Sequence, residues 1–212
     1  MSTVVTPPGI PIVISAASGT GKTSLCVRLL ETLSNVARSI SYTTRPQRGH
    51  EQDGRDYFFV NDATFLRMVD EGDFVEWAEV FGRRYGTAFS AVQEQLQQGV
   101  DVLLDIDVQG GQQIKDRFAE ALTIFLLPPS MAELRRRLEN RATEAADAVE
   151  RRLSEARREI EAGQGYDLLI VNDDFEQAAA DLRAVIRTHR LRLRRPTALV
   201  EELIQRPEEL DS

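Results

Sequence analysis

The sequence is poor in the residues that cross-link a chain or bind a metal ion. It holds one cysteine, Cys26, and two histidines among 212 residues. An internal disulfide needs two cysteines, and a Cys/His metal site needs several ligands at set spacings, so neither holds this fold together. We expect Cys26 to be a buried residue of a helix.

Long hydrophobic runs are also missing. No stretch of about 18 residues is continuously apolar, which excludes an ordinary membrane-spanning helix. The opening residues MSTVVTPPGIP lack the basic-then-apolar order of a signal peptide. We therefore expect a cytoplasmic protein without a membrane partner.

Basic residues are fewer than acidic ones, and almost all of them are arginines. The chain has 26 basic and 34 acidic residues, and its formal net charge of −8 argues against a nucleic-acid partner. Only two of the basic residues are lysines, and one of these is Lys22. In the Arg-rich segment 183–195, Val185, Ile186 and His189 continue a helical spacing that begins at Leu182, so we interpret the arginines as the solvated side of a helix.

What the sequence does contain fits one globular domain with inserted lobes. Short β-branched runs alternate with amphipathic segments, which predicts an α/β fold: a parallel sheet with helices on both faces. The runs expected as buried strands are IPIVIS (10–15), VDVLLDID (100–107), LTIFLLP (122–128) and YDLLIVN (166–172).

Two segments interrupt this alternation. Residues 36–87 show short alternating runs with Gly and Pro, which predicts an inserted, mostly antiparallel lobe. Residues 135–163 are rich in Arg and Glu, which indicates an exposed helical lid. The expected core consists of residues 10–35, 88–134 and 164–195, and residues 196–212 form a C-terminal tail.

The stretch ISAASGTGKTSL (14–25) lies between an expected strand and an expected helix. It departs from the phosphate-loop pattern G-x-x-x-x-G-K-[ST] because Ala16 replaces the first glycine, and alanine fits there unless φ is positive. Backbone N–H groups of such a loop bind anions, while Lys22 would reach the outer phosphates and Thr23 would ligate Mg²⁺. The alternative is a plain strand–turn–helix connection. The residues expected around the phosphates are Ala16, Ala17, Ser18, Gly19, Thr20, Gly21, Lys22, Thr23 and Ser24.

Two aspartates end a later strand. In VLLDID, Asp105 and Asp107 alternate along the strand, so they would point to one face about 6.6 Å apart. One carboxylate there can hold Mg²⁺ through water, and we assign that role to Asp105. The alternative is a pair of aspartates that only face solvent.

Together with these motifs, the middle of the chain resembles the guanylate kinase family. The segments SISYTTRPQRGHEQDGRDYFFV, FVEWAEVFGRRYGT, LLDIDVQGGQQIK, IFLLPPS and YDLLIVNDD follow the family's order and spacing over residues 10–190. The resemblance implies a P-loop NTPase-type fold with an NMP-binding lobe and a lid. It implies transfer of the γ-phosphoryl group of ATP, with Mg²⁺, to GMP and to dGMP. The departures are Ala16 and Ala17 for Gly-Pro, His50 for a common glycine, and Ala142 after Arg141.

The same resemblance assigns the site residues. Guanine recognition falls to Ser41, Glu76 and Thr87, with Asp107 close by. A carboxylate at Glu76 suits guanine because it accepts from both N1–H and N2–H₂, whereas adenine has an acceptor at N1. The residues assigned to the GMP phosphate are Arg45, Arg48, Tyr57 and Tyr85. The residues assigned to catalysis are Lys22, Arg45 and the lid arginines Arg137, Arg141 and Arg152.

Two other functions stay open at this point. One is a guanylate kinase-like interaction module without catalysis, and the complete set Gly19, Gly21, Lys22 and Thr23 speaks against it. The other is a kinase of a different nucleoside monophosphate or of another small acceptor, and Glu76 and Ser41 speak against that.

Overall fold

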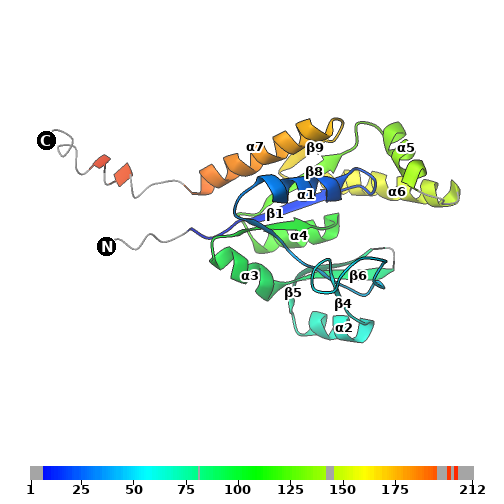
Figure 1. The fold of residues 1–212 in the computed structure, drawn as a ribbon, viewed down its shortest axis with the longest axis horizontal. Coiled ribbons are helices and arrows are strands. Elements are labelled where there is room, and N and C mark those ends of the chain that lie inside the picture. Colours follow the sequence, from blue (N-terminus) through cyan, green and yellow to red (C-terminus); the bar gives the residue numbers. More distant parts are fainter. Residues whose placement is uncertain (1–6, 81, 142–145, 195–199, 202, 205–212) are drawn as a thin grey trace.

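A parallel sheet forms the centre of the molecule (Figure 1). The structure is a computed structural model that describes residues 7–80, 82–141, 146–194, 200–201 and 203–204. The order of the sheet is β2-β7-β1-β8-β9, and all its neighbouring strands are parallel. Its strands are β1 (Pro11–Ala16), β2 (Val36–Arg38), β7 (Asp101–Asp105), β8 (Leu122–Leu127) and β9 (Leu168–Val171).

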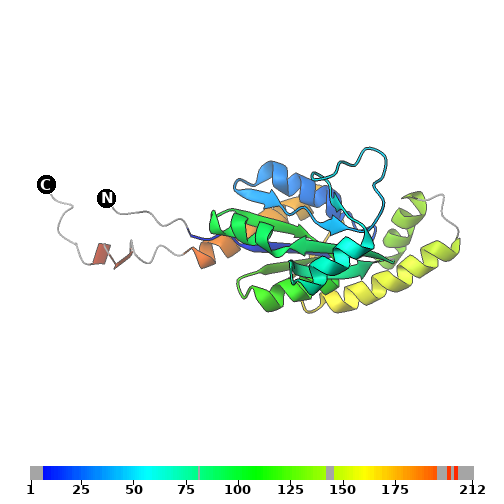
Figure 2. The same cartoon turned by 90° about the horizontal axis from the view of Figure 1, so that it is seen from below.

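Helices cover both faces of this sheet, as the sequence predicted (Figure 2). On one face, α1 (Lys22–Thr32) and α7 (Phe175–Leu193) pack on Ile12 and Ile14 of β1. On the other face, α3 (Phe89–Gln97) and α4 (Val108–Arg117) pack on Val13. Alternate residues of β1 thus enter two cores, and each buried aliphatic side chain contributes roughly 1.5–3 kcal/mol.

A second, smaller sheet carries the inserted lobe. Its order is β4-β3-β6-β5, with β3–β6 and β5–β6 antiparallel and β3–β4 parallel, so the mostly antiparallel lobe is confirmed. The strands are β3 (Tyr42–Thr43), β4 (Phe58–Phe59), β5 (Phe74–Val80) and β6 (Arg83–Ala88), and α2 (Asp62–Asp70) follows β4. Residues 36–38, which we assigned to the lobe, instead pair with β7 of the parallel sheet.

Two helices, α5 (Met131–Arg141) and α6 (Ala146–Gly163), form the expected lid. We expected this region to be exposed, but the pair buries an apolar cluster of its own. The cluster consists of Ala17, Leu134, Leu138, Val149, Leu153 and Ala156. Because Ala17 belongs to the phosphate loop, the lid helices are packed directly on that loop.

One expectation drawn from a scarce residue also holds. Cys26 is buried in α1, and burial raises the pKa of its thiol to about 12, which keeps the thiol neutral. Among the described residues, none of the helices combines the length and the apolar character that crossing a bilayer would require.

Candidate active site

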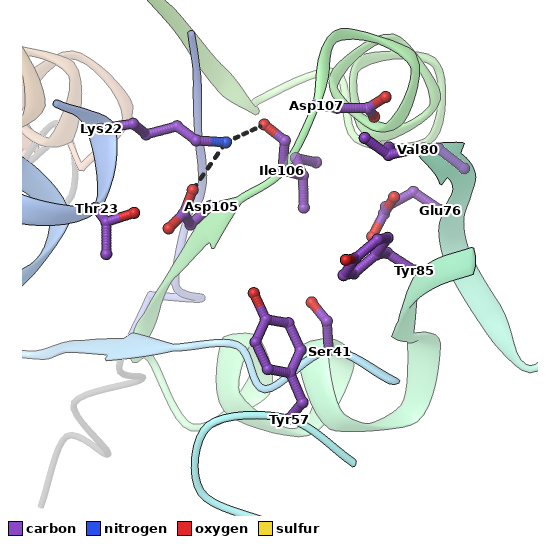
Figure 3. A pocket seen from close by; sticks show the side chains of 11 residues that line it. Lys22, Thr23, Ser41, Tyr57, Glu76, Val80, Tyr85, Asp105, Ile106 and Asp107 are labelled. Carbon is purple, nitrogen blue, oxygen red and sulfur yellow. Dashed lines mark hydrogen bonds and ion pairs between the residues drawn. The ribbon is translucent and has the colours of Figure 1, made fainter. Parts of the chain in front are cut away.

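Most of the residues predicted to bind nucleotides line two adjoining cavities beside the carboxyl end of β7. The first cavity, of about 260 Å³, is lined by Ser41, Tyr57, Glu76 and Tyr85, among others (Figure 3). The second, also about 260 Å³, is lined by the phosphate loop from Ala16 to Thr23. Lys22, Thr23 and Asp107 line both cavities, so the two adjoin at the start of α1.

The phosphate loop has the backbone that its sequence demands. Gly19 and Gly21 adopt φ of 93° and 99°, a region that favours glycine, and Gly21 is the N-cap of α1. Among the non-glycine residues of the described part, Asn35 alone has a positive φ, so the φ of Ala16 is negative. Alanine is therefore compatible with the first position of the loop. Ser24 does not line either cavity and lies instead in a hollow beside Phe175.

Lys22 extends from the start of α1 toward the end of β7. Its Nζ lies 2.8 Å from Asp105 Oδ1 and donates to the backbone oxygen of Ile106 at 2.8 Å (Figure 3). Burial alone would lower the pKa of Lys22, but the Asp105 carboxylate outweighs this and raises it. The lysine therefore stays charged at the junction of the two cavities.

Asp105 and Asp107 have different surroundings, which corrects our prediction of one shared strand face. Strand β7 ends at Asp105, and Asp107 is the N-cap of α4, where its Oδ1 accepts the N–H of Gly110 at 2.9 Å. The alternation of side chains therefore stops before Asp107. In Figure 3, Asp105 faces Lys22 and Thr23, while Asp107 lies nearer Val80. Both aspartates still line the first cavity.

A carboxylate lies buried at the lobe end of the first cavity. Glu76 of β5 is 3% exposed, and its Oε1 accepts a hydrogen bond from Thr87 Oγ1 of β6 at 2.5 Å. The hydroxyl of Ser41 lies 3.4 Å from that of Thr87. Burial raises the pKa of Glu76 to about 7, although the Thr87 hydrogen bond opposes the rise. The three residues predicted to recognise guanine thus form one connected group.

Gly110 of α4 makes room for this carboxylate, and we did not single it out from the sequence. A Cβ at Gly110 would lie 2.4 Å from Glu76 Oε2, which no side chain can occupy without a shift. The sequence signal was the pair Gly110-Gly111, which is unfavourable within a helix and therefore needs a packing reason.

Arg45 occupies an adjoining hollow of the lobe, and it does not line the cavity that contains Glu76. It is 8% exposed, and its guanidinium lies over the rings of Tyr57 and Phe59. The guanidinium donates to both carboxylate oxygens of Glu51, at 2.9 and 2.7 Å. These hydrogen bonds lower the pKa of Glu51. Glu51 is a second residue that our sequence reasoning missed.

The hollow of Arg45 borders the first cavity through shared walls. Arg48 lines the same hollow, and both Val80 and Tyr85 line this hollow and the first cavity. The backbone N–H of Arg48 donates to Glu51 Oε2 at 2.8 Å. The four predicted phosphate residues are therefore gathered around one side of the lobe.

Two of the lid arginines, Arg137 and Arg152, do not line either of the two cavities. Arg137 donates to Glu133 at 2.8 Å, to the backbone oxygen of Asn172 at 3.3 Å, and to that of Thr20 at 3.4 Å. Arg152 lies half-buried on α6. The side chain of Arg141, and Ala142 after it, lie outside the described residues.

Glu159 of α6 is a further acidic group at the phosphate loop that sequence reasoning missed. It lines the second cavity together with Ser18 of the phosphate loop. Burial raises its pKa, and the positive charge of Lys22 opposes the rise. Its distance in sequence from the loop left no local signal.

Comparisons with known proteins agree with this geometry. The sequence model of the family described as guanylate kinase matches residues 9–189. The guanylate kinase of Myxococcus xanthus is 50% identical over 192 residues, which are 90% of this chain and 92% of that protein. The guanylate kinase of Acinetobacter baylyi is 48% identical over 200 residues, covering 92% and 97%. A crystal structure of guanylate kinase from Anaplasma phagocytophilum has a TM-score of 0.77 at 35% identity, covering 95% of this chain and 97% of that one.

Proposed function

The chain belongs to the guanylate kinase family, and from that premise we propose which of its residues bind each of the two nucleotides. Its reaction transfers the γ-phosphoryl group of ATP to GMP and yields ADP and GDP. The observation that carries the assignment of sites is the junction at Lys22, which lines the cavity of the phosphate loop and the cavity of Glu76. Donor and acceptor phosphates would meet there.

The proposed ATP site is the second cavity. Backbone N–H groups from Ser18 to Gly21 bind the phosphates at the N-terminus of α1, where the helix dipole favours negative charge. Lys22 exchanges its contacts with Asp105 and the Ile106 carbonyl for oxygens of the outer phosphates. A compact ammonium fits between phosphate oxygens better than a planar guanidinium, which accounts for a lysine in an arginine-rich chain.

The residues present fit a magnesium ion that arrives with ATP. The hydroxyl of Thr23 and the carboxylate of Asp105 line the same cavity and are oxygen donors, which Mg²⁺ prefers. Within the described residues, no group of three or more His, Cys, Asp or Glu could hold a metal ion by itself. Phosphate oxygens and water would therefore complete the shell, with Asp105 acting through water. Bound Mg²⁺ would neutralise charge that develops on the transferred group.

The proposed guanine site is the group Ser41, Glu76 and Thr87, with Asp107 nearby. The ionised carboxylate of Glu76 accepts from N1–H and N2–H₂ of guanine, while Thr87 holds Oε1 in place. Adenine would leave a buried carboxylate facing its N1 lone pair, which is costly in a desolvated site. This contrast is the physical basis of selection for GMP.

The proposed site of the GMP phosphate is the hollow of Arg45, Arg48 and Tyr85, together with Tyr57, whose ring lies against the Arg45 guanidinium. A phosphate dianion would replace Glu51 as the bidentate partner of Arg45. The residues assigned to GMP recognise its base and phosphate, and none is assigned to the ribose 2′-hydroxyl. We therefore extend the proposal to dGMP as a second acceptor.

The transfer itself needs charge and alignment. The attacking oxygen belongs to the GMP phosphate and is already nucleophilic, so no general base is required. Arg137 adds positive charge through its contacts with the loop backbone, and Arg141 and Arg152 approach the transferring group as the lid closes. Closure would also exclude water and prevent hydrolysis of ATP.

Turnover with GMP, dGMP, AMP, CMP and UMP, each with Mg²⁺ and ATP, tests this proposal. We expect turnover with GMP and dGMP to exceed that with the other three acceptors by orders of magnitude. An interaction module without catalysis would turn over none of them, and a kinase of another nucleotide would prefer a different acceptor. Since both substrates are cytoplasmic metabolites, we propose that the protein works in the cytoplasm.

A further inference from the structure

The phosphate loop is held from outside the two cavities by Asn172, to which we assigned no role from the sequence. Asn172 directly follows β9, is 5% exposed, and its backbone N–H donates to Leu127 of β8 at 2.8 Å. Its side-chain Nδ2 donates to the backbone oxygen of Thr20 at 2.6 Å. Asn172 is therefore held to the sheet by its backbone and to the loop by its side chain.

The hydrogen bond to Thr20 sets the direction of the next N–H. The described chain contains no cis peptide bond, and in a trans peptide the C=O and the N–H point in opposite directions. With the Thr20 oxygen directed at Asn172, the N–H of Gly21 points away from Asn172. Asn172 does not line the second cavity, whereas Gly21 does, so this N–H is aimed at the phosphate side.

Close packing supports the same arrangement. A Cβ at Gly21 would lie 2.7 Å from Asn172 Nδ2, so the amide rests directly on the loop backbone. Thr20 is fully buried, and in the described structure its hydroxyl has no hydrogen-bond partner. The Thr20 carbonyl is thus the point at which Asn172 holds the loop. Arg137 adds a weaker contact to the same oxygen at 3.4 Å.

We propose that Asn172 is a positioning residue for ATP, which fixes the Thr20–Gly21 peptide so that the Gly21 N–H faces the phosphates. A donor is required at this place, because a carboxylate or an alkyl group cannot hold a carbonyl oxygen. Preorganised N–H groups bind anions well because they need no reorganisation when the ligand arrives. The inference rests on the proposed binding of ATP phosphates by this loop.

Two substitutions separate the lost donor from added charge. Asn172→Leu removes the donor and stays neutral, and Asn172→Asp keeps the shape but directs a carboxylate oxygen at Thr20. Asn140→Leu, at an exposed position of α5, is the matched control. Titration calorimetry would measure the Kd of inorganic tripolyphosphate and of ATP, each with Mg²⁺, and the Kd of GMP for every variant.

We expect both Asn172 variants to bind tripolyphosphate and ATP about tenfold or more weakly, which corresponds to a lost hydrogen bond of about 1.4 kcal/mol. The Kd of GMP should stay within about twofold, because the Glu76 site does not contact this part of the loop. The control should bind all three ligands as the wild type does.

Three results would overturn the inference. Wild-type affinity of Asn172→Leu for tripolyphosphate would show that the donor is unnecessary. A loss confined to Asn172→Asp would assign the effect to charge, and equal losses for GMP and tripolyphosphate would indicate general damage to the fold. If Asn172→Leu does not fold by circular dichroism, Asn172→Ala replaces it in the same titration. Failure of the wild type itself to bind tripolyphosphate would instead refute the proposed ATP site.

Discussion

Glu76 combines a cost in stability with a role in binding, and the substitution Glu76→Gln separates the two. The carboxylate is 3% exposed, and burial raises its pKa from 4.5 to about 7. This is the reverse of an ion-paired carboxylate, because the folded protein binds the proton more tightly than the unfolded chain does. Stability therefore falls as pH rises from 4.5 to about 7, and the full cost is present above pH 7.

The size of this cost follows from the shift in pKa. A rise from 4.5 to about 7 corresponds to about 3 kcal/mol in the free energy of unfolding. A glutamine has nearly the same shape and no charge to desolvate. We expect Glu76→Gln to be more stable than the wild type by up to about 3 kcal/mol at pH 8, with a difference that shrinks toward zero near pH 4.5. Urea unfolding across this pH range measures it.

Binding of GMP should change in the opposite direction. Glutamine offers one acceptor oxygen and an NH₂ group that would face the guanine donors, so we expect GMP to bind about 100-fold more weakly or worse. In the wild type, GMP needs the ionised carboxylate, so its affinity should fall by up to about tenfold per pH unit below pH 7. Calorimetry with GMP from pH 5.5 to 8 tests both statements.

The matched control for these measurements is Glu79→Gln, which removes an exposed carboxylate from the same strand, β5. It should change neither the pH dependence of stability nor the affinity for GMP. A stability difference between Glu76→Gln and the wild type that is constant from pH 5 to 8 would refute the argument from burial. Unchanged affinity for GMP in Glu76→Gln would refute our account of specificity.

Three other predictions follow from single contacts. Lys22→Ala should lower turnover by roughly 10²–10³ and change the thermal unfolding midpoint little. A variant that is largely unfolded at the assay temperature would instead argue for a structural lysine. Gly110→Ala places a Cβ 2.4 Å from Glu76 Oε2, so it should raise the KM for GMP and leave the affinity for ATP nearly unchanged. A comparable loss of ATP affinity in this variant would show that the substitution disturbs more than the GMP site. Removal of Mg²⁺ with a chelator should abolish turnover reversibly, while the Kd of GMP measured without ATP should stay the same, since the proposed ion arrives with ATP.

The tertiary structure corrected details that no short pattern contains. The alternation of VLLDID indicated a shared face for Asp105 and Asp107, but the strand stops at Asp105 because α4 begins just beyond it. Glu51 and Glu159 approach Arg45 and Ser18, respectively, and these contacts arise from loop and helix packing. Sequence periodicity indicates which face of a helix or strand is buried, but it does not indicate which residues pack against that face.

Several features were determined by the sequence alone. The alternation of β-branched runs with amphipathic segments led to a parallel sheet covered on both faces, because only that arrangement buries strands that are apolar on both sides. The loop around Lys22 could be recognised because glycines at positive φ, a lysine and a helix start are local properties of consecutive residues. The family could be named because motifs from distant parts of the chain keep one order and spacing.

Only the tertiary structure decided which partners these residues have. It brought Glu76 against Gly110 and Asn172 against Thr20, two pairs that join different segments of the chain, and it folded one loop so that Glu51 meets Arg45. Their contacts depend on the crossing of strands and helices that are folded together. A local pattern fixes the conformation of a segment, but the charge balance, the space and the hydrogen bonds of a site belong to the packed whole.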